Sequence, residues 1–200
     1  MTDLKDLMIS RVRVKLLELF FAGGEEMYYV RQITRLIKEE INAVRRELDR
    51  MVGFGLLKSE QRGNRLYYRL NPRYLFFNEL KQMIAKTTGP GKKIRRAKRK
   101  LGEVNYVIFS SKFVMGQKPV KDEVEVFVVG KVVLKELDLL IKQEEEKRQR
   151  EINYAVLSQE EFEFRKTRRD PFVMEILLTP YVMVVGDAVK FAQRQTPGLS

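Results

Sequence analysis

Residues 41–51 carry side chains that can hydrogen-bond to nucleic acid, at a spacing that gathers them on one surface. Four apolar side chains recur there at intervals of three and four residues, which predicts one buried face of an α-helix. These are Ile41, Val44, Leu48 and Met51. The rest of the helix surface would carry Asn42, Arg45, Arg46, Asp49 and Arg50. Arginine pairs with guanine edges and asparagine with adenine edges, and both bind phosphate. The alternative is an ordinary surface helix with a solvated, charged face.

A second set of chemically interesting residues lies in the C-terminal half. Glu123 and Glu125 are two residues apart in a segment of strand-like alternation, so both carboxylates would project from one face of a strand. Paired carboxylates are ligands for Mg²⁺. The simpler interpretation is a solvent-facing strand edge. The chain contains no Cys and no His, which excludes Cys/His zinc sites, thiol catalysis and any Ser–His mechanism.

The positive charge of the chain is concentrated in its first half. The formal net charge is +12, from 39 Lys and Arg against 27 Asp and Glu. Residues 1–90 hold 17 basic and 11 acidic side chains, residues 91–100 hold 7 basic ones and no acid, and residues 101–200 hold 15 and 16. This asymmetry indicates a polyanion partner, and nucleic acid fits better than a membrane because no Trp/Phe-rich basic amphipathic helix accompanies the charge.

The composition predicts a folded protein that does not cross a membrane. A hydrophobic fraction of 44% is enough for a packed core. No apolar run approaches the roughly 20 residues of a membrane span, and there is no secretory signal. We therefore expect a cytoplasmic protein.

The first 70 residues predict three helices followed by a hairpin. Helices are expected at 9–21, with Ser10 as N-cap and Gly23-Gly24 as the stop, at 30–37 and at 41–51, with a short extended piece at 27–29. A strand begins at Leu56-Leu57, and residues 65–70 alternate as a second strand. Arg62-Gly63-Asn64 would form the hairpin tip.

Residues 10–71 resemble the winged helix-turn-helix domains of bacterial and archaeal transcription regulators. Four segments carry the resemblance: Tyr29 to Ile33, Val44 to Leu48, Gly55 to Leu57, and the basic hairpin Arg62 to Arg69. The resemblance implies a DNA-binding domain over residues 1–72, whose helix at 41–51 reads the major groove. The expected base contacts are Asn42, Arg45, Arg46 and Asp49. The expected contacts near phosphates and at the wing are Arg31, Gln32, Arg35, Arg50, Arg62, Asn64 and Arg65. A winged helix used only for protein contact is the alternative.

Residues 73–103 are expected to connect two domains. An apolar helix over 74–86 is a plausible dimer element, residues 87–91 read as a break, and the basic run 92–100 would add phosphate contacts without sequence information.

From residue 104 onward, strands alternate with helices, which predicts a small α/β domain with a mixed sheet. The order of elements over residues 104–187 resembles the minimal nucleotidyltransferase fold. That family has a Gly-Ser pair after its first strand, two Asp separated by one residue, and a third Asp on the next strand. The matching positions here are Ser110-Ser111, Glu123 and Glu125, and Asn153. All three motifs depart from the pattern, since Gly is missing, the carboxylates are one methylene longer, and Asn carries no charge. We therefore expect a vestigial, non-catalytic site in a domain over residues 104–190, followed by a tail at 191–200.

Together these features predict an α+β protein that acts as a transcriptional regulator. It would bind double-stranded DNA as a homodimer, with no cofactor, and its C-terminal domain would serve oligomerisation or ligand sensing. The alternatives are an Mg²⁺-dependent nucleotidyltransferase acting on a protein or RNA acceptor, in which case Mg²⁺ and a nucleotide would bind, and an RNA-binding protein.

Overall fold

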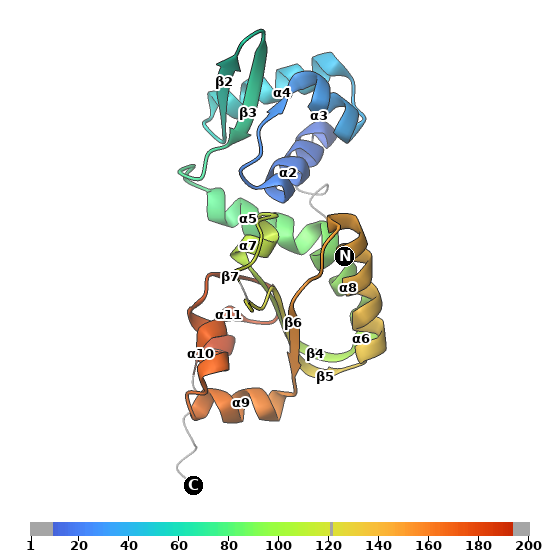
Figure 1. The fold of residues 1–200 in the computed structure, drawn as a ribbon, viewed down its shortest axis with the longest axis vertical. Coiled ribbons are helices and arrows are strands. Elements are labelled where there is room, and N and C mark those ends of the chain that lie inside the picture. Colours follow the sequence, from blue (N-terminus) through green and yellow to red (C-terminus); the bar gives the residue numbers. More distant parts are fainter. Residues whose placement is uncertain (1–9, 121, 194–200) are drawn as a thin grey trace. The chain divides into compact units, whose positions relative to one another are not determined.

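The computed structural model describes residues 10–120 and 122–193, and it has the α+β class expected from the sequence (Figure 1). The chain divides into two compact units. The first comprises Met1–Thr88 and Val114–Gln117, and the second comprises Gly89–Phe113 and Lys118–Ser200. Two sequence predictions, the start of a helix at Ile9 and the part of the tail beyond residue 193, lie outside the described residues.

Within residues 10–88, the first unit has three helices, a three-stranded sheet and a fourth helix. In order, its elements are α2 (Arg11–Gly23), β1 (Tyr28–Tyr29), α3 (Val30–Ile37), α4 (Ile41–Gly53), β2 (Leu57–Arg62), β3 (Arg65–Leu70) and α5 (Phe77–Thr87). The sheet order is β1-β3-β2 with both pairings antiparallel. The Ser10 hydroxyl accepts a hydrogen bond from Arg13 N–H, so it caps α2 as predicted.

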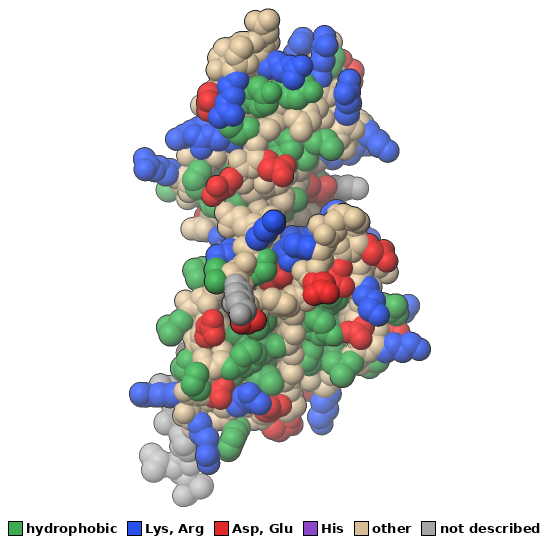
Figure 2. Space-filling model, in the orientation of Figure 1, with side chains coloured by type: hydrophobic (Ala, Val, Ile, Leu, Met, Phe, Trp, Pro, Cys, Tyr) green, Lys and Arg blue, Asp and Glu red, His purple; other side chains and the backbone are tan. Residues whose placement is uncertain are grey.

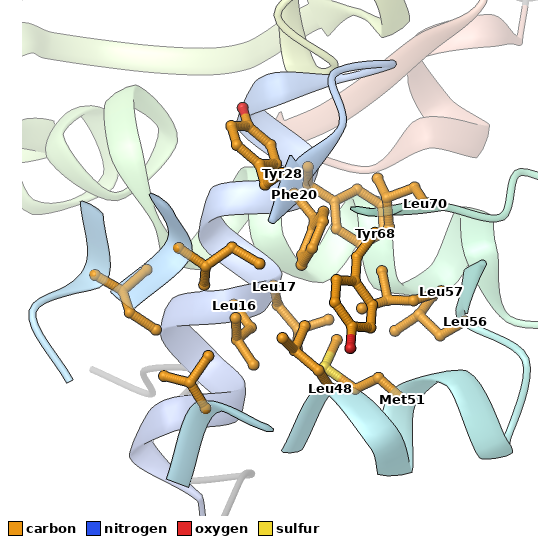
Figure 3. Close-up of a cluster of buried hydrophobic side chains, with 14 of the residues drawn as sticks. Leu16, Leu17, Phe20, Tyr28, Leu48, Met51, Leu56, Leu57, Tyr68 and Leu70 are labelled. Atoms are coloured by element: carbon orange, nitrogen blue, oxygen red, sulfur yellow. The ribbon is translucent and has the colours of Figure 1, made fainter. Parts of the chain in front are cut away.

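One hydrophobic core joins these elements (Figure 3). The inner faces of α2 and α4 meet the inner face of the sheet, and Figure 3 shows Leu17, Leu48 and Tyr68 converging there. Val44, Leu48 and Met51 are fully buried, which confirms most of the predicted apolar face of the helix at 41–51, whereas Ile41 is only half-buried. That packing fixes which side of α4 faces solvent.

Helix α5 begins three residues later than the sequence predicted. Tyr74 N–H donates to Asn71 O, and Phe77 N–H donates to Tyr74 O, so residues 71–77 form successive turns. Leu80, Met83 and Ile84 pack on the first core. Leu75 and Phe76 remain exposed, at 79% and 53%.

The second unit is a four-stranded mixed sheet with helices. Its elements are α6 (Gly89–Leu101), β4 (Gly102–Ser110), α7 (Ser111–Val114, whose last residue belongs to the first unit), β5 (Val126–Val132), α8 (Leu134–Arg148), β6 (Tyr154–Leu157), α9 (Gln159–Thr167), α10 (Pro171–Leu178), β7 (Tyr181–Val185) and α11 (Ala188–Ala192). The sheet order is β6-β5-β4-β7, and only the β5–β6 pair is parallel.

Helices cover both faces of this sheet. Phe127 and Val129 of β5 pack with residues of α9, α10 and α11. Alternation directs Val126 and Val128 to the opposite face, where both are also buried. Figure 1 shows α6 and α8 on one side of the sheet and α9 to α11 on the other. The Ser158 hydroxyl caps α9 by accepting a hydrogen bond from Glu161 N–H.

The segment expected to connect two domains is built into the units themselves. The break predicted over 87–91 is confined to Thr88, where α5 has ended and the two units divide. Gly89 takes a left-handed φ of 47°, and Pro90 then sits in the first turn of α6. Gly91, Ile94 and Leu101 of α6 are buried within the second unit. Across the described ranges, no helix is long and apolar enough to cross a bilayer.

Candidate nucleic-acid interface

A groove in the first unit gathers most of the predicted DNA contacts. It is bounded by the end of β1 and helix α3, by helix α4, and by the β2–β3 hairpin. Its lining residues are Tyr29, Val30, Arg31, Arg35, Arg45, Asp49, Asn64, Arg65, Leu66 and Tyr68. Six of the eleven residues proposed from sequence therefore face one concave surface, although they come from three elements.

The groove is electropositive because its arginines are not neutralised locally. Arg31, Arg35, Arg45 and Arg65 make no ion pair with any carboxylate of the described residues, and Asp49 is the one acidic side chain among the lining residues. Figure 2 shows Lys and Arg side chains gathered on the end of the first unit that carries these elements. A concave cationic surface attracts a polyanion at long range.

Two glutamates hold α4 in place, Glu40 at its N-terminus and Glu47 on its inner face. The Glu40 carboxylate caps the helix by accepting hydrogen bonds at 2.8 Å from Asn42 N–H and Ala43 N–H, which lower the pKa of Glu40. This carboxylate occupies the amides that a phosphate would otherwise use. Glu47 points inward, with its side chain 5% exposed, and pairs with Arg13 of α2.

A further ion pair holds the turn between α3 and α4. Lys15 Nζ of α2 donates to Ile37 O at 2.8 Å and lies 2.6 Å from Glu39 Oε1, which also contacts Arg11. The hydrogen bond from Lys15 is the largest cause of the lowered pKa of Glu39. Lys38 closes α3 in the left-handed conformation. These contacts fix the angle at which α4 leaves α3, and so the direction of its outer face.

The hairpin presents its two arginines beside aromatic rings. Arg62 and Arg65 are cross-strand partners that flank the Gly63-Asn64 turn, as the sequence predicted. Arg62 Nε pairs with Glu60 Oε1 at 2.8 Å, and the Arg65 guanidinium lies 4.7 Å from the centre of the Tyr29 ring. Arg65 is therefore held over the groove, whereas Arg62 is partly neutralised.

The other proposed contacts lie outside the groove. Asn42 and Arg46 are exposed on α4, Gln32 is half-buried on α3, and Arg50 lies 3.8 Å from Glu47. Sequence reasoning missed Tyr29, Val30, Leu66 and Tyr68 as groove residues. The signal for Tyr29 is the short extended piece expected at 27–29, because this piece becomes β1 and pairs with Tyr67 of β3.

The C-terminal residues of interest lie around a small pocket in the second unit. Ser110, Glu123 and Glu125 line it, together with Asp122, Glu175, Phe172 and Tyr181 among others. Ser111 begins α7 and Asn153 precedes β6, and neither belongs to the lining. Ser110 Oγ accepts a hydrogen bond from Phe113 N–H, so it caps the short helix α7.

The prediction that Glu123 and Glu125 share a strand is wrong. Asp122 takes a left-handed φ of 64°, and Glu123 Oε2 accepts from Val120 N–H, so this segment turns and β5 starts only at Val126. The two carboxylates bind different cations: Lys112 Nζ donates to Glu123 Oε2 at 2.8 Å, and Arg150 holds both oxygens of Glu125. Although burial opposes it, the bonds from Lys112 and Val120 lower the pKa of Glu123.

This arrangement does not fit an Mg²⁺ site. Both carboxylates already have cationic partners, and Asn153 Nδ2 donates to Glu123 O rather than offering an oxygen to a metal. Within residues 10–120 and 122–193, no group of three acidic side chains is placed to hold a metal ion. We therefore derive no metal-dependent step at this pocket.

No protein-family model and no curated protein matches the chain. Among solved structures, human N-acetylserotonin methyltransferase in complex with SAM is similar to 48% of this chain at 18% identity, with a TM-score of 0.30. The chain spans 32% of that protein's length. A likeness this slight carries no argument about fold or function.

Proposed function

We propose that this protein is a transcriptional regulator whose first unit is a winged helix-turn-helix domain that binds double-stranded DNA. One observation carries the proposal: four arginines without carboxylate partners among the described residues line one groove, although they come from α3, α4 and the β2–β3 hairpin. Folding alone does not require a cluster of like charges, because exposed cations repel one another at this range. A polyanion supplies the missing counter-charge.

The order of the elements supports a duplex as the polyanion. Helices α3 and α4 are joined by three residues, and the hairpin follows α4 directly, which is the order of a winged helix-turn-helix. The α4 side chains Asn42, Arg45, Arg46 and Asp49 are all exposed. Their type suits base edges: arginine for guanine, asparagine for adenine, and aspartate for the amino group of cytosine.

The remaining cations are assigned to the phosphate backbone. These residues are Arg31, Arg35, Arg50, Arg62 and Arg65, with Gln32 and Asn64 beside them and the basic helix α6 in support. Phosphate contacts position a protein on DNA, and base contacts provide the sequence preference.

The second unit serves oligomerisation or ligand sensing in this proposal, and the regulator acts in the cytoplasm as a homodimer. Catalysis is not part of the proposal, because Glu123 and Glu125 are engaged by Lys112 and Arg150.

The test is fluorescence anisotropy against a duplex from the region upstream of the protein's own gene and against a scrambled duplex, over a salt series. Arg45→Ala should weaken binding to the preferred duplex by about 1–3 kcal/mol and should weaken scrambled binding less. Arg73→Ala removes the same charge from an exposed site that does not line the groove, and it should leave the preference intact.

Equal binding of the wild-type protein to both duplexes at every salt concentration would contradict the proposal. The positive charge would then bind nucleic acid without regard to its sequence.

A further inference from the structure

The outer face of the β1-β3-β2 sheet carries a set of side chains of which only Tyr29 and Arg65 also line the groove. Cross-strand partners share a face of a sheet, and Tyr68 and Leu70 of β3 point into the core. Tyr67 and its partner Tyr29 therefore lie on the outer face. So do Arg65 with Arg62, and Arg69 with Lys58.

The aromatic rings and guanidinium groups on this face form a contiguous series. The Tyr29 and Tyr67 rings lie 5.6 Å apart between centroids, at an interplanar angle of 65°. The Arg65 guanidinium lies 4.7 Å from the Tyr29 ring, and that of Arg62 lies 5.9 Å from the Tyr67 ring. Both tyrosines are only half-buried. The two rings thus meet edge to face, each has a guanidinium group beside it, and both remain partly exposed on the outer face of the sheet.

The charge on this face is positive. Lys58, Arg62, Arg65 and Arg69 are opposed by Glu60, which pairs with Arg62. Lys58 and Arg69 make no side-chain hydrogen bond or ion pair within the described part of the chain. Flat stacking surfaces bordered by unpaired cations match a nucleic-acid strand whose bases are exposed.

We propose that this outer face, centred on Tyr67 and Arg69, binds a short segment of single-stranded DNA. Tyrosine and arginine planes stack on unpaired bases, and the cations hold the phosphates. Duplex bases stack on each other and offer no such face, so the rings favour an unpaired strand. Three strands about 4.8 Å apart give room for roughly two or three bases.

The choice of DNA rests on the proposed duplex-binding function. Arg65 and Tyr29 line the groove and also belong to this face, so the two surfaces are continuous. An unwound segment next to a bound duplex would reach the sheet without leaving the protein.

The test uses the full chain with a labelled oligothymidine of about ten nucleotides and an abasic strand of the same length. The wild-type protein should bind oligothymidine more tightly than the abasic strand, and binding should quench tyrosine fluorescence. Tyr67→Leu, which keeps an apolar residue on the strand, should lose roughly tenfold in oligothymidine affinity and keep its duplex affinity. Tyr67→Phe keeps the ring and should retain binding.

Matched variants separate this site from the groove. Arg69→Gln should weaken oligothymidine binding even if Tyr67→Leu does not fold, whereas Arg46→Ala on α4 should weaken only duplex binding. Equal affinity of the wild type for oligothymidine and the abasic strand, or tighter binding of oligouridine, would overturn the inference. Binding of oligothymidine that depends on Tyr67, without any duplex preference, would support this site and overturn only the proposed duplex readout.

Discussion

At the scale of single residues, two adjacent side chains of α4 point in different directions, one to solvent and one into the protein. Arg46 faces solvent, and Glu47 beside it is 4% exposed. The Glu47 carboxylate pairs with Arg13, and it accepts a bond from Ser10 Oγ at 3.3 Å. A buried carboxylate is tolerated only when its hydrogen bonds are satisfied. Glu47 therefore fixes the rotation of α4 about its axis, and with it the direction of the arginines.

Replacing Glu47 with glutamine should destabilise the protein. The variant keeps the shape but loses the charge that Arg13 meets, and Arg13 itself is partly solvated, so the expected loss in free energy of unfolding is about 1–3 kcal/mol. Urea denaturation measures it. Asp49→Asn, an exposed change on the same helix, should alter stability by less than about 0.5 kcal/mol. Equal midpoints for both variants would show that the Glu47 contacts are not stabilising.

At the scale of elements, the cap of α4 should give the protein a pH-dependent component of stability. Hydrogen bonds from Asn42 N–H and Ala43 N–H lower the pKa of Glu40 in the folded state. The carboxylate is thus favoured by folding. The contribution of this cap to the free energy of unfolding is fully present above the pKa that Glu40 has in the unfolded state. It is lost as the pH falls through the lower pKa of Glu40 in the folded state.

Glu40→Gln should therefore flatten the dependence of melting temperature on pH in the acid range. The measurement is a series of thermal melts from about pH 6 down to pH 3, around the unfolded pKa of about 4.3. Glu79→Gln provides a control, since Glu79 lies in the first turn of α5 and makes no described side-chain hydrogen bond. Parallel curves for the wild type and Glu40→Gln would disprove the role of the cap.

Two glycines let residues 114–117 pack closely against the end of α2 in the first unit. A Cβ on Gly116 would lie 2.0 Å from Ala22 O, and a Cβ on Gly24 would lie 2.2 Å from Met115 O. Both glycines have positive φ, at 66° and 61°. The backbone at Ala22–Gly24 and the backbone at Met115–Gly116 therefore lie so close that neither glycine has room for a side chain.

Gly116→Ala should cost about 2–4 kcal/mol of unfolding free energy, because it combines an unfavourable φ with a clash against backbone. Gly55→Ala is the matched control. Gly55 has a φ of 84° but no atom near its added Cβ, so it should lose only about 1–2 kcal/mol. A similar loss for both in urea denaturation would mean that the close approach contributes nothing.

The elements that the sequence predicted well are those with a clear period. Helices α3 and α4 and the hairpin follow from apolar spacing and from Gly63-Asn64, and their local pattern agrees with the packing. The start of α6 lies within the predicted break at 87–91, because proline suits a first helical turn as well as a loop. Glu123 and Glu125 were misplaced because alternation in sequence does not reveal a turn closed by Val120 N–H and the left-handed Asp122.

The sequence predicts several individual residues of the candidate site, but it does not predict that they meet in one groove. The residue types alone predict Arg31, Arg45 and Arg65 as DNA contacts, and each lies on a separate element. Their common groove depends on the angle between α3 and α4, which Lys15 and Glu39 set through contacts distant in sequence. The aromatic row on the sheet likewise depends on the Tyr29–Tyr67 register, which needs β1 to pair with β3.

At the scale of the whole molecule, helix α6 holds seven of the 39 basic side chains and no acidic one, in a chain whose net charge is +12. Lys98, Arg99 and Lys100 form the exposed last turn of α6, in the second unit. In the proposed DNA binding, we expect these three side chains to contribute through charge alone and not through contacts to bases. Each phosphate contact adds about −0.9 to the slope of log affinity against log salt.

Replacing these three residues with glutamine should flatten that slope by about two to three units while leaving the preference between duplexes unchanged. Four groove arginines alone would leave a slope of about −4. The control is a triple variant of Lys131, Lys135 and Lys190 to glutamine, which removes equal charge from exposed positions on β5, α8 and α11. If the control flattens the slope as much as the α6 variant, the effect comes from net charge, and α6 makes no phosphate contacts of its own.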